Sequence, residues 1–151
     1  MAAEYFANAV QEIGLNSSAI FTASIPCTKG YVFHTDESGV FILRGITNGQ
    51  RYATYQVTLN ANIAIPEGGT VTPIAVAISV NGEALPTSRA IFTPAAVSQY
   101  GNVSCTAIIK VPRGCCTQIA IRYVSASNDP TVIPTPVIEM QNANLVIDRI
   151  A

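Results

Sequence analysis

The sequence predicts an all-β fold, an antiparallel jelly-roll sandwich of about ten short strands. Two stretches, 52–63 and 74–80, alternate between apolar and small or polar residues, and this period of two is typical of strands. Turn-forming residues recur at roughly the 8–12-residue spacing of β-sandwiches. No repeat or linker divides the 151 residues, so we expect one domain spanning 1–151.

The N-terminal part alternates only loosely. Residues 2–13 have some helical propensity, but Asn16, Ser17 and Ser18 indicate a turn, so we favour two short strands within 4–25. A loop is expected at 26–30. Residues 31–34 and 40–43 then predict a hairpin around the polar turn 36–39, and 45–51 is a further loop.

The stretch 52–63 has the clearest alternation in the chain. The face predicted to be buried comprises Tyr55, Val57, Leu59, Ala61 and Ile63. The opposite face, Thr54, Gln56, Thr58, Asn60 and Asn62, has amides and hydroxyls but no charge. Such a face suits a subunit contact as well as it suits solvent. A glycine-rich turn at 66–70 ends this part of the chain.

The stretch 71–116 contains the strongest turn signal. Ile74, Val76, Ile78 and Val80 share one strand face, and Asn81-Gly82 follows, a pair typical of type I′ hairpin turns. The returning segment lies between Pro86 and Pro94, which predicts an edge or interrupted strand. Val103, Cys105, Ala107, Ile109 and Val111 form the inner face of the next strand, which ends at a turn, 112–114.

Three segments complete the predicted sandwich. Residues 117–123 alternate with Ile119, Ile121 and Tyr123 inward, and 125–136 is a loop rich in Ser, Asn, Asp and Pro. Strands at 137–140 and 145–150 follow. The last strand is apolar on both faces, which predicts a central position in its sheet.

Composition excludes several classes of function. Charged residues make up only 11% of the chain, its net charge is −1, and its eight basic residues are scattered, so we expect neither nucleic acid nor an anionic membrane as partner. No apolar run approaches the roughly 18 residues of a membrane span. No basic segment precedes Lys29, so we expect no signal peptide and synthesis in a cytoplasm.

The four cysteines are Cys27, Cys105, Cys115 and Cys116. In a reducing compartment they are most simply small hydrophobic residues, although a disulfide from Cys27 to one of the others is an open alternative. Their spacing does not match a zinc site. We therefore predict neither a metal nor a cofactor.

The search for catalytic residues is negative. His34 is the single histidine, next to a hairpin turn and without a nucleophile elbow, so we expect an ordinary strand residue and no enzyme. Asp36 and Glu37 indicate a solvated turn, and Gly68-Gly69 has no following helix to form a phosphate loop. Tyr100, beside Gly101, is the best candidate for an exposed aromatic that contacts a partner.

Several motifs do carry a resemblance: NGE at 81–83, PAA at 94–96, PRGCC at 112–116 and NANL at 142–145. With these motifs, about 5–151 resembles a group of small phage and prophage head-decoration, or head-fibre, proteins. These in turn are similar to the trimeric, tumour-necrosis-factor (TNF)-like jelly rolls that end collagen-like spore-surface glycoproteins. The collagen-like Gly-X-Y stem is absent here, which favours a free-standing capsid protein over a spore-coat protein.

The resemblance implies a ten-stranded TNF-like jelly roll that forms a homotrimer through its inner sheet. It implies a structural role in a bacteriophage virion: decorating or cementing the capsid through the major capsid protein, after synthesis in the bacterial cytoplasm. Residues 1–15 are then either a capsid-docking segment or the first strand. The alternative function is a module that binds carbohydrate or the host surface, because jelly rolls often bind sugars.

Overall fold

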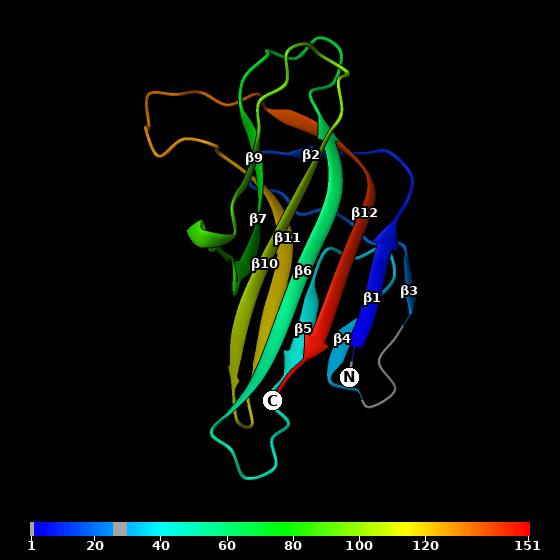
Figure 1. The fold of residues 1–151 in the computed structure, drawn as a ribbon, viewed down its shortest axis with the longest axis vertical. Coiled ribbons are helices and arrows are strands. Elements are labelled where there is room, and N and C mark those ends of the chain that lie inside the picture. Colours follow the sequence, from blue (N-terminus) through cyan, green and yellow to red (C-terminus); the bar gives the residue numbers. More distant parts are fainter. Residues whose placement is uncertain (1, 26–29) are drawn as a thin grey trace.

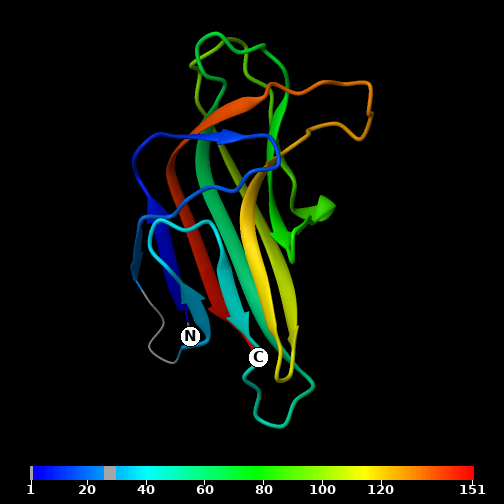
Figure 2. The ribbon, with the colours of Figure 1, turned by 180° about the vertical axis from the view of Figure 1, so that it is seen from behind.

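Two antiparallel sheets form the protein (Figure 1), in a computed structural model that describes residues 2–25 and 30–151. Sheet I has the order β10 (Gly101–Pro112), β6 (Tyr52–Ala64), β12 (Val137–Arg149), β1 (Ala2–Ala7), β3 (Ala23–Ile25), with β2 (Gln11–Gly14) also paired to β12. Sheet II has the order β4 (Val32–His34), β5 (Phe41–Arg44), β11 (Cys116–Val124), β7 (Ile74–Val80), β8 (Glu83–Ala84), with β9 (Ala90–Phe92) also on β7. Sheet II is best seen from behind (Figure 2).

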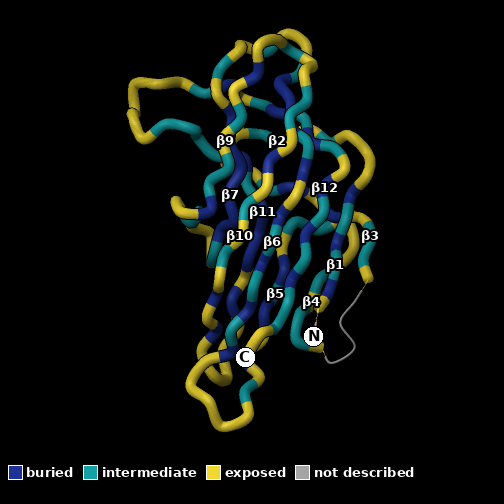
Figure 3. Tube along the Cα trace, in the orientation of Figure 1, coloured by how far each residue is buried: buried dark blue, intermediate teal, exposed yellow. Residues whose placement is uncertain are grey.

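The predicted inner faces fill the space between the sheets. The five residues expected to be buried in β6, at 55, 57, 59, 61 and 63, are at most 1% exposed. They meet the inward side chains of sheet II, among them Phe41, Ile78 and Ile121, in one core cluster. Buried segments accordingly run along the middle of both sheets, and exposed ones lie in the loops (Figure 3). The jelly-roll prediction is therefore confirmed.

The hairpin predicted at Asn81-Gly82 is present. β7 and β8 pair through Ser79–Ala84 and Val80–Glu83, and the two turn residues have φ angles of 50° and 89°, as a type I′ turn requires. The returning segment is interrupted, as the prolines predicted, because the 3₁₀ turn Pro86–Ser88 separates β8 from β9. This interruption contributes to a total of twelve described strands, where about ten were expected.

The N- and C-terminal segments lie side by side in sheet I. β1 pairs with β12 on one side and with β3 on the other, so residues 2–7 form an internal strand. β12 is central, as predicted, since it also pairs with β6 and β2. The expectation of two separate final strands is wrong: β12 runs through 137–149 with a bulge between Gln141 and Asn144. In the described part, no helix is long and apolar enough to cross a membrane.

Candidate functional surface

The outward face of sheet I contains the uncharged row of β6 that the sequence predicts to contact a subunit or solvent. Burial alternates along β6 and β10, and it resumes alternating after the bulge in β12, so every second side chain points away from the core. We define the sheet I face as Thr54, Gln56, Thr58, Asn60 and Asn62 of β6, Asn102, Ser104, Thr106 and Ile108 of β10, and Gln141, Asn144 and Val146 of β12. None of these side chains is charged.

Hydrogen bonds connect the amides of the sheet I face across the strands. Asn102 Nδ2 donates to Asn60 Oδ1 at 2.9 Å and to Asn62 Oδ1 at 3.1 Å. Thr106 Oγ1 donates to Thr58 Oγ1 at 3.4 Å. Because these groups already satisfy one another, part of this polar face can be covered by a partner with little loss of hydrogen bonding.

The bulge in β12 determines which of its side chains point outward on the sheet I face. Asn142 adopts a φ of 50°, and its N–H donates to the Asn8 carbonyl at 3.4 Å, outside the ladder with β6. The register then resumes with Asn144 opposite Asn60. A bulge of this kind re-aims the side chains that follow it. Without it, Leu145 and Ile147 would point outward and Val146 inward.

Charges appear only towards the margins of this surface. Lys110 continues the outward row of β10, opposite Thr54, and its Nζ lies 6.0 Å from the centre of the Tyr52 ring. Asp148 and Glu4 lie on the same side, opposite Gln56 and Val146 respectively. The centre of the sheet I face thus consists of amide and hydroxyl side chains and two aliphatic side chains, Ile108 and Val146.

His34 is placed as an aromatic packing residue. Its ring stacks on Phe41, with centroids 4.2 Å apart, and meets the edge of Tyr5 at 5.0 Å. Nε2 lies 3.0 Å from the Ser38 carbonyl, whereas Nδ1 is buried without a partner. Because a carbonyl oxygen only accepts, Nε2 donates this bond, and the ring packs against two aromatic side chains.

The remaining polar candidates also sit in structural positions. Asp36 and Glu37 are exposed in the β4–β5 turn, where Glu37 has a φ of 68°. Gly68 and Gly69 form the turn after β6, again with no following helix. Across residues 2–25 and 30–151, no three His, Cys, Asp or Glu side chains gather into a metal site.

Tyr100 differs from its predicted role. Its ring is half-buried, and its hydroxyl donates to Glu139 Oε2 at 2.6 Å, which ties the loop before β10 to the central strand β12. Desolvation, reinforced by the hydrogen bond and the negative charge of Glu139, raises the pKa of Tyr100 to about 12. The residue is therefore a tether within the protein and is half-buried where an exposed ring was expected, while its contact with a partner stays a prediction.

The three described cysteines are free thiols. Cys105 is half-buried, and desolvation raises the pKa of its thiol to about 11. Cys115 and Cys116 are both exposed, so the expectation that the cysteines are buried hydrophobic residues fails for this pair. The alternative of a disulfide to Cys27 stays a prediction, because Cys27 lies outside the described residues.

Comparisons with known proteins agree on the fold. No protein-family model and no curated protein matches the sequence. Among solved structures, the globular domain of zebrafish complement 1qA protein is similar with a TM-score of 0.65 at 11% identity, over 99% of this chain and 97% of that one. The Eiger TNF from S. frugiperda has a TM-score of 0.65 at 10% identity, over 100% of this chain and 92% of that one. The chain therefore has a C1q/TNF-like jelly-roll fold.

Proposed function

We propose that the protein is a homotrimeric structural protein of a bacteriophage virion, which decorates or cements the capsid or forms a head fibre. The TNF-like fold supports a structural module, and the sequence motifs at 81–83, 94–96, 112–116 and 142–145 support the phage context. In this role the protein is made in the bacterial cytoplasm, binds the major capsid protein, and works without a cofactor or catalytic residue.

The sheet I face is the observation that carries self-association. It combines internally bonded amides with Ile108, whose side chain is 54% exposed, and it has no charge at its centre. Charged groups are the most expensive to desolvate, so their absence lowers the free energy needed to bury this face. Most oligomers close by symmetry, and the fold resemblance favours a threefold.

The capsid contact is proposed for the N-terminal segment, 1–15. Since β1 is embedded in sheet I, the part of the segment available for a partner is the β1–β2 corner. Val10 is 53% exposed there, and Ile20 is 44% exposed beside it. The two residues line an apolar cleft of about 410 Å³. In the proposed role, this cleft receives the capsid protein.

Co-sedimentation with capsids that lack the protein tests the proposal. Wild-type protein should sediment with the capsids at a fixed ratio. Ile20→Asp should abolish this binding, because a charge would then have to be buried in the apolar cleft. Ile133→Asp is the matched control, since Ile133 is 84% exposed in the β11–β12 loop.

The outcomes separate the two parts of the proposal. If wild-type protein does not bind capsids, the proposed virion role is wrong. The proposed trimer is tested separately, by measuring the mass of the protein in solution. If Ile20→Asp binds as well as Ile133→Asp, the β1–β2 corner is not the docking site.

A further inference from the structure

Basic residues gather at one end of the molecule, although they are scattered along the sequence. Of the seven lysines and arginines in the described residues, five lie at the end where β6 begins and β10 finishes: Arg44, Arg51, Lys110, Arg113 and Arg149. The other end of β6 is acidic, with Glu139 paired to Ala64, Glu12 paired to Glu139, and Glu67 in the following turn. The chain is nearly neutral overall, but its basic residues gather at one end of the long strands and acidic residues at the other.

A set of backbone hydrogen bonds holds this basic end together. The Arg113 N–H donates to the Arg51 carbonyl at 3.0 Å, so two arginines distant in sequence become neighbours across the end of the ladder. Gly45 donates to the Cys115 carbonyl at 2.9 Å, and Gly114 donates to the Gly45 carbonyl at 3.1 Å. The loop 45–51 and the turn 112–115 therefore form one fixed platform.

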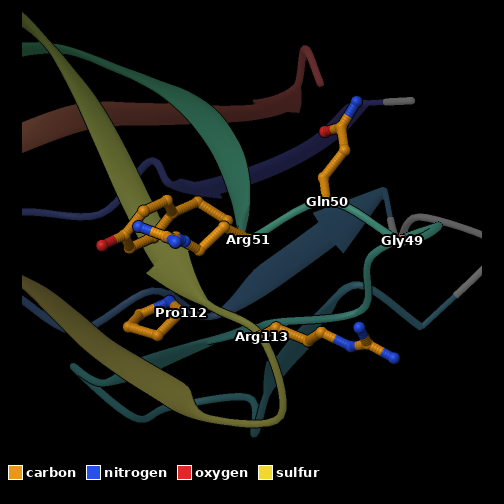
Figure 4. A pocket seen from close by; sticks show the side chains of 6 residues that line it. Gly49, Gln50, Arg51, Pro112 and Arg113 are labelled. Carbon is orange, nitrogen blue, oxygen red and sulfur yellow. The ribbon is translucent and has the colours of Figure 1, made fainter.

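A cleft of about 430 Å³ lies on this platform (Figure 4). It is lined by Gly49, Gln50, Arg51, Tyr52, Pro112 and Arg113. Arg51 and Arg113 reach it from different segments, and Tyr52, which is 42% exposed, supplies an aromatic surface. The volume is within the range of small-molecule sites and larger than a single phosphate or carboxylate group needs.

The side chains that line the cleft include two cations and no acid. No carboxylate side chain is among its lining residues, and Lys110 adds a third cation near the Tyr52 ring. Asp148 pairs with Gln56, four residues along β6 from Tyr52, which is about 13 Å away at roughly 3.3 Å per residue. That separation exceeds the Debye length of about 8 Å at physiological salt. The Arg113–Arg51 backbone bond thus keeps two like charges at one end of the protein, although their side chains extend in different directions (Figure 4), and an anion bound at the cleft would reduce their repulsion.

We propose that this cleft, the Arg51–Arg113 cleft, binds an acidic saccharide of a cell surface. The two guanidinium groups would hold its carboxylate, sulfate or phosphate oxygens, since guanidinium forks match the geometry of oxyanions. The Tyr52 ring would pack against a sugar face, and the Gln50 amide would bond to hydroxyls. The site does not depend on capsid docking and would serve a virion protein or a free lectin equally.

Calorimetric titration of the full chain with matched saccharides tests this site. Oligogalacturonate should bind, and its fully methyl-esterified form, which has the same sugars without the charge, should not. Comparing dextran sulfate with dextran shows whether sulfate groups on a sugar are bound. Inorganic phosphate shows whether an anion without a sugar is bound. Binding of oligogalacturonate should weaken as salt rises. If inorganic phosphate competes but no saccharide binds, the site recognises anions alone and the saccharide assignment is overturned.

Substitutions locate the binding. Arg51→Gln and Arg113→Gln should each weaken oligogalacturonate at least about tenfold, because each removes charge-assisted hydrogen bonds. Arg89→Gln, which makes the same change in net charge at a distant site bonded to Ser125 and Asn128, should have no effect. Tyr52→Ala should weaken oligogalacturonate without changing phosphate binding.

Three results would overturn the proposal. If Arg89→Gln weakened oligogalacturonate binding as much as Arg51→Gln or Arg113→Gln, the binding would be a non-specific attraction of polyanions to positive charge. Unchanged binding in the Arg51→Gln, Arg113→Gln double variant would place the ligand elsewhere, and unaltered melting temperatures verify that these exposed substitutions leave the fold intact. Salt-sensitive association of the protein alone, lost in the double variant, would show that the cleft receives the acidic end of a second copy.

Discussion

Gly45 lies against the carbonyl oxygen of Pro112 so closely that no β-carbon fits between them. This contact fixes the loop before β6 against the end of β10, and the Gly45–Cys115 and Gly114–Gly45 hydrogen bonds depend on it. Gly45→Ala should therefore force the backbone apart and lower stability by about 1–3 kcal/mol, the usual effect of overpacking. Thermal unfolding measures this change. Gly14→Ala is the control, because a β-carbon there meets only ordinary contacts at 3.5 Å and beyond, and an equal loss in both variants would contradict the account.

Gly82 in the β7–β8 turn is required for its backbone conformation and not for a close contact. A β-carbon on Gly82 would meet no atom within 4 Å, yet its φ of 89° is unfavourable for any other residue. Gly82→Val should lower stability by about 1–3 kcal/mol through backbone strain. Chemical denaturation with a shifted midpoint and an unchanged slope is the expected readout. A midpoint equal to that of wild type would mean that the turn adopts another conformation in solution.

Stability should fall steeply at alkaline pH. Burial raises the pKa of Tyr123 to about 12, and its hydroxyl donates to the Thr135 carbonyl inside the protein. In the unfolded chain a tyrosine ionises near pH 10. The stability that the protonated Tyr123 contributes is therefore fully present below about pH 10 and is lost as the pH rises through about 12. Tyr100 contributes over the same pH range. Tyr123→Phe should be less stable at pH 7 but show a shallower decline from pH 10 to 12; an equally steep decline would contradict this assignment.

The free thiols should differ in reactivity. The thiolate is the reactive form, and burial raises the pKa of Cys105 to about 11, so little thiolate is present at pH 8. Cys115 and Cys116 are exposed and should react with iodoacetamide first. Trypsin separates the two sites, into peptides 90–110 and 114–122, so mass spectrometry can follow each rate. Labelling of Cys105 at the same rate as the exposed pair would show that β10 opens in solution.

Local patterns explain the parts of the fold that could be predicted. The buried side of β6 follows from its alternation, and the β7–β8 hairpin follows from Asn81-Gly82, because both depend on residues close in sequence. The bulge in β12 was not predicted, since a positive φ at Asn142 has no strong signal among the polar residues that surround it. Asparagine does tolerate that conformation, so the NANL motif was a weak sign of it.

The surface features could not be predicted because they depend on tertiary pairing. Arg51 and Arg113 become neighbours only when β6 and β10 pair in register, and their spacing in the chain has no periodicity that would indicate it. Tyr100 was expected to be exposed because it lies beside Gly101 in a predicted loop, but its partner, Glu139, lies on a strand distant in sequence. Conversely, the uncharged outward row of β6 was visible in the sequence, since one strand presents it continuously.

The central claim is that the sheet I face holds copies of the chain together. Light scattering coupled to size-exclusion chromatography at micromolar concentration tests it most directly. The account predicts three times the 15.9 kDa chain mass for wild type and for Thr70→Arg, an exposed loop control. It predicts a loss of that mass for Thr106→Arg, which places a charge on the face at a position exposed in the single chain. A wild-type mass of one chain, or a Thr106→Arg variant that remains fully trimeric, would contradict it.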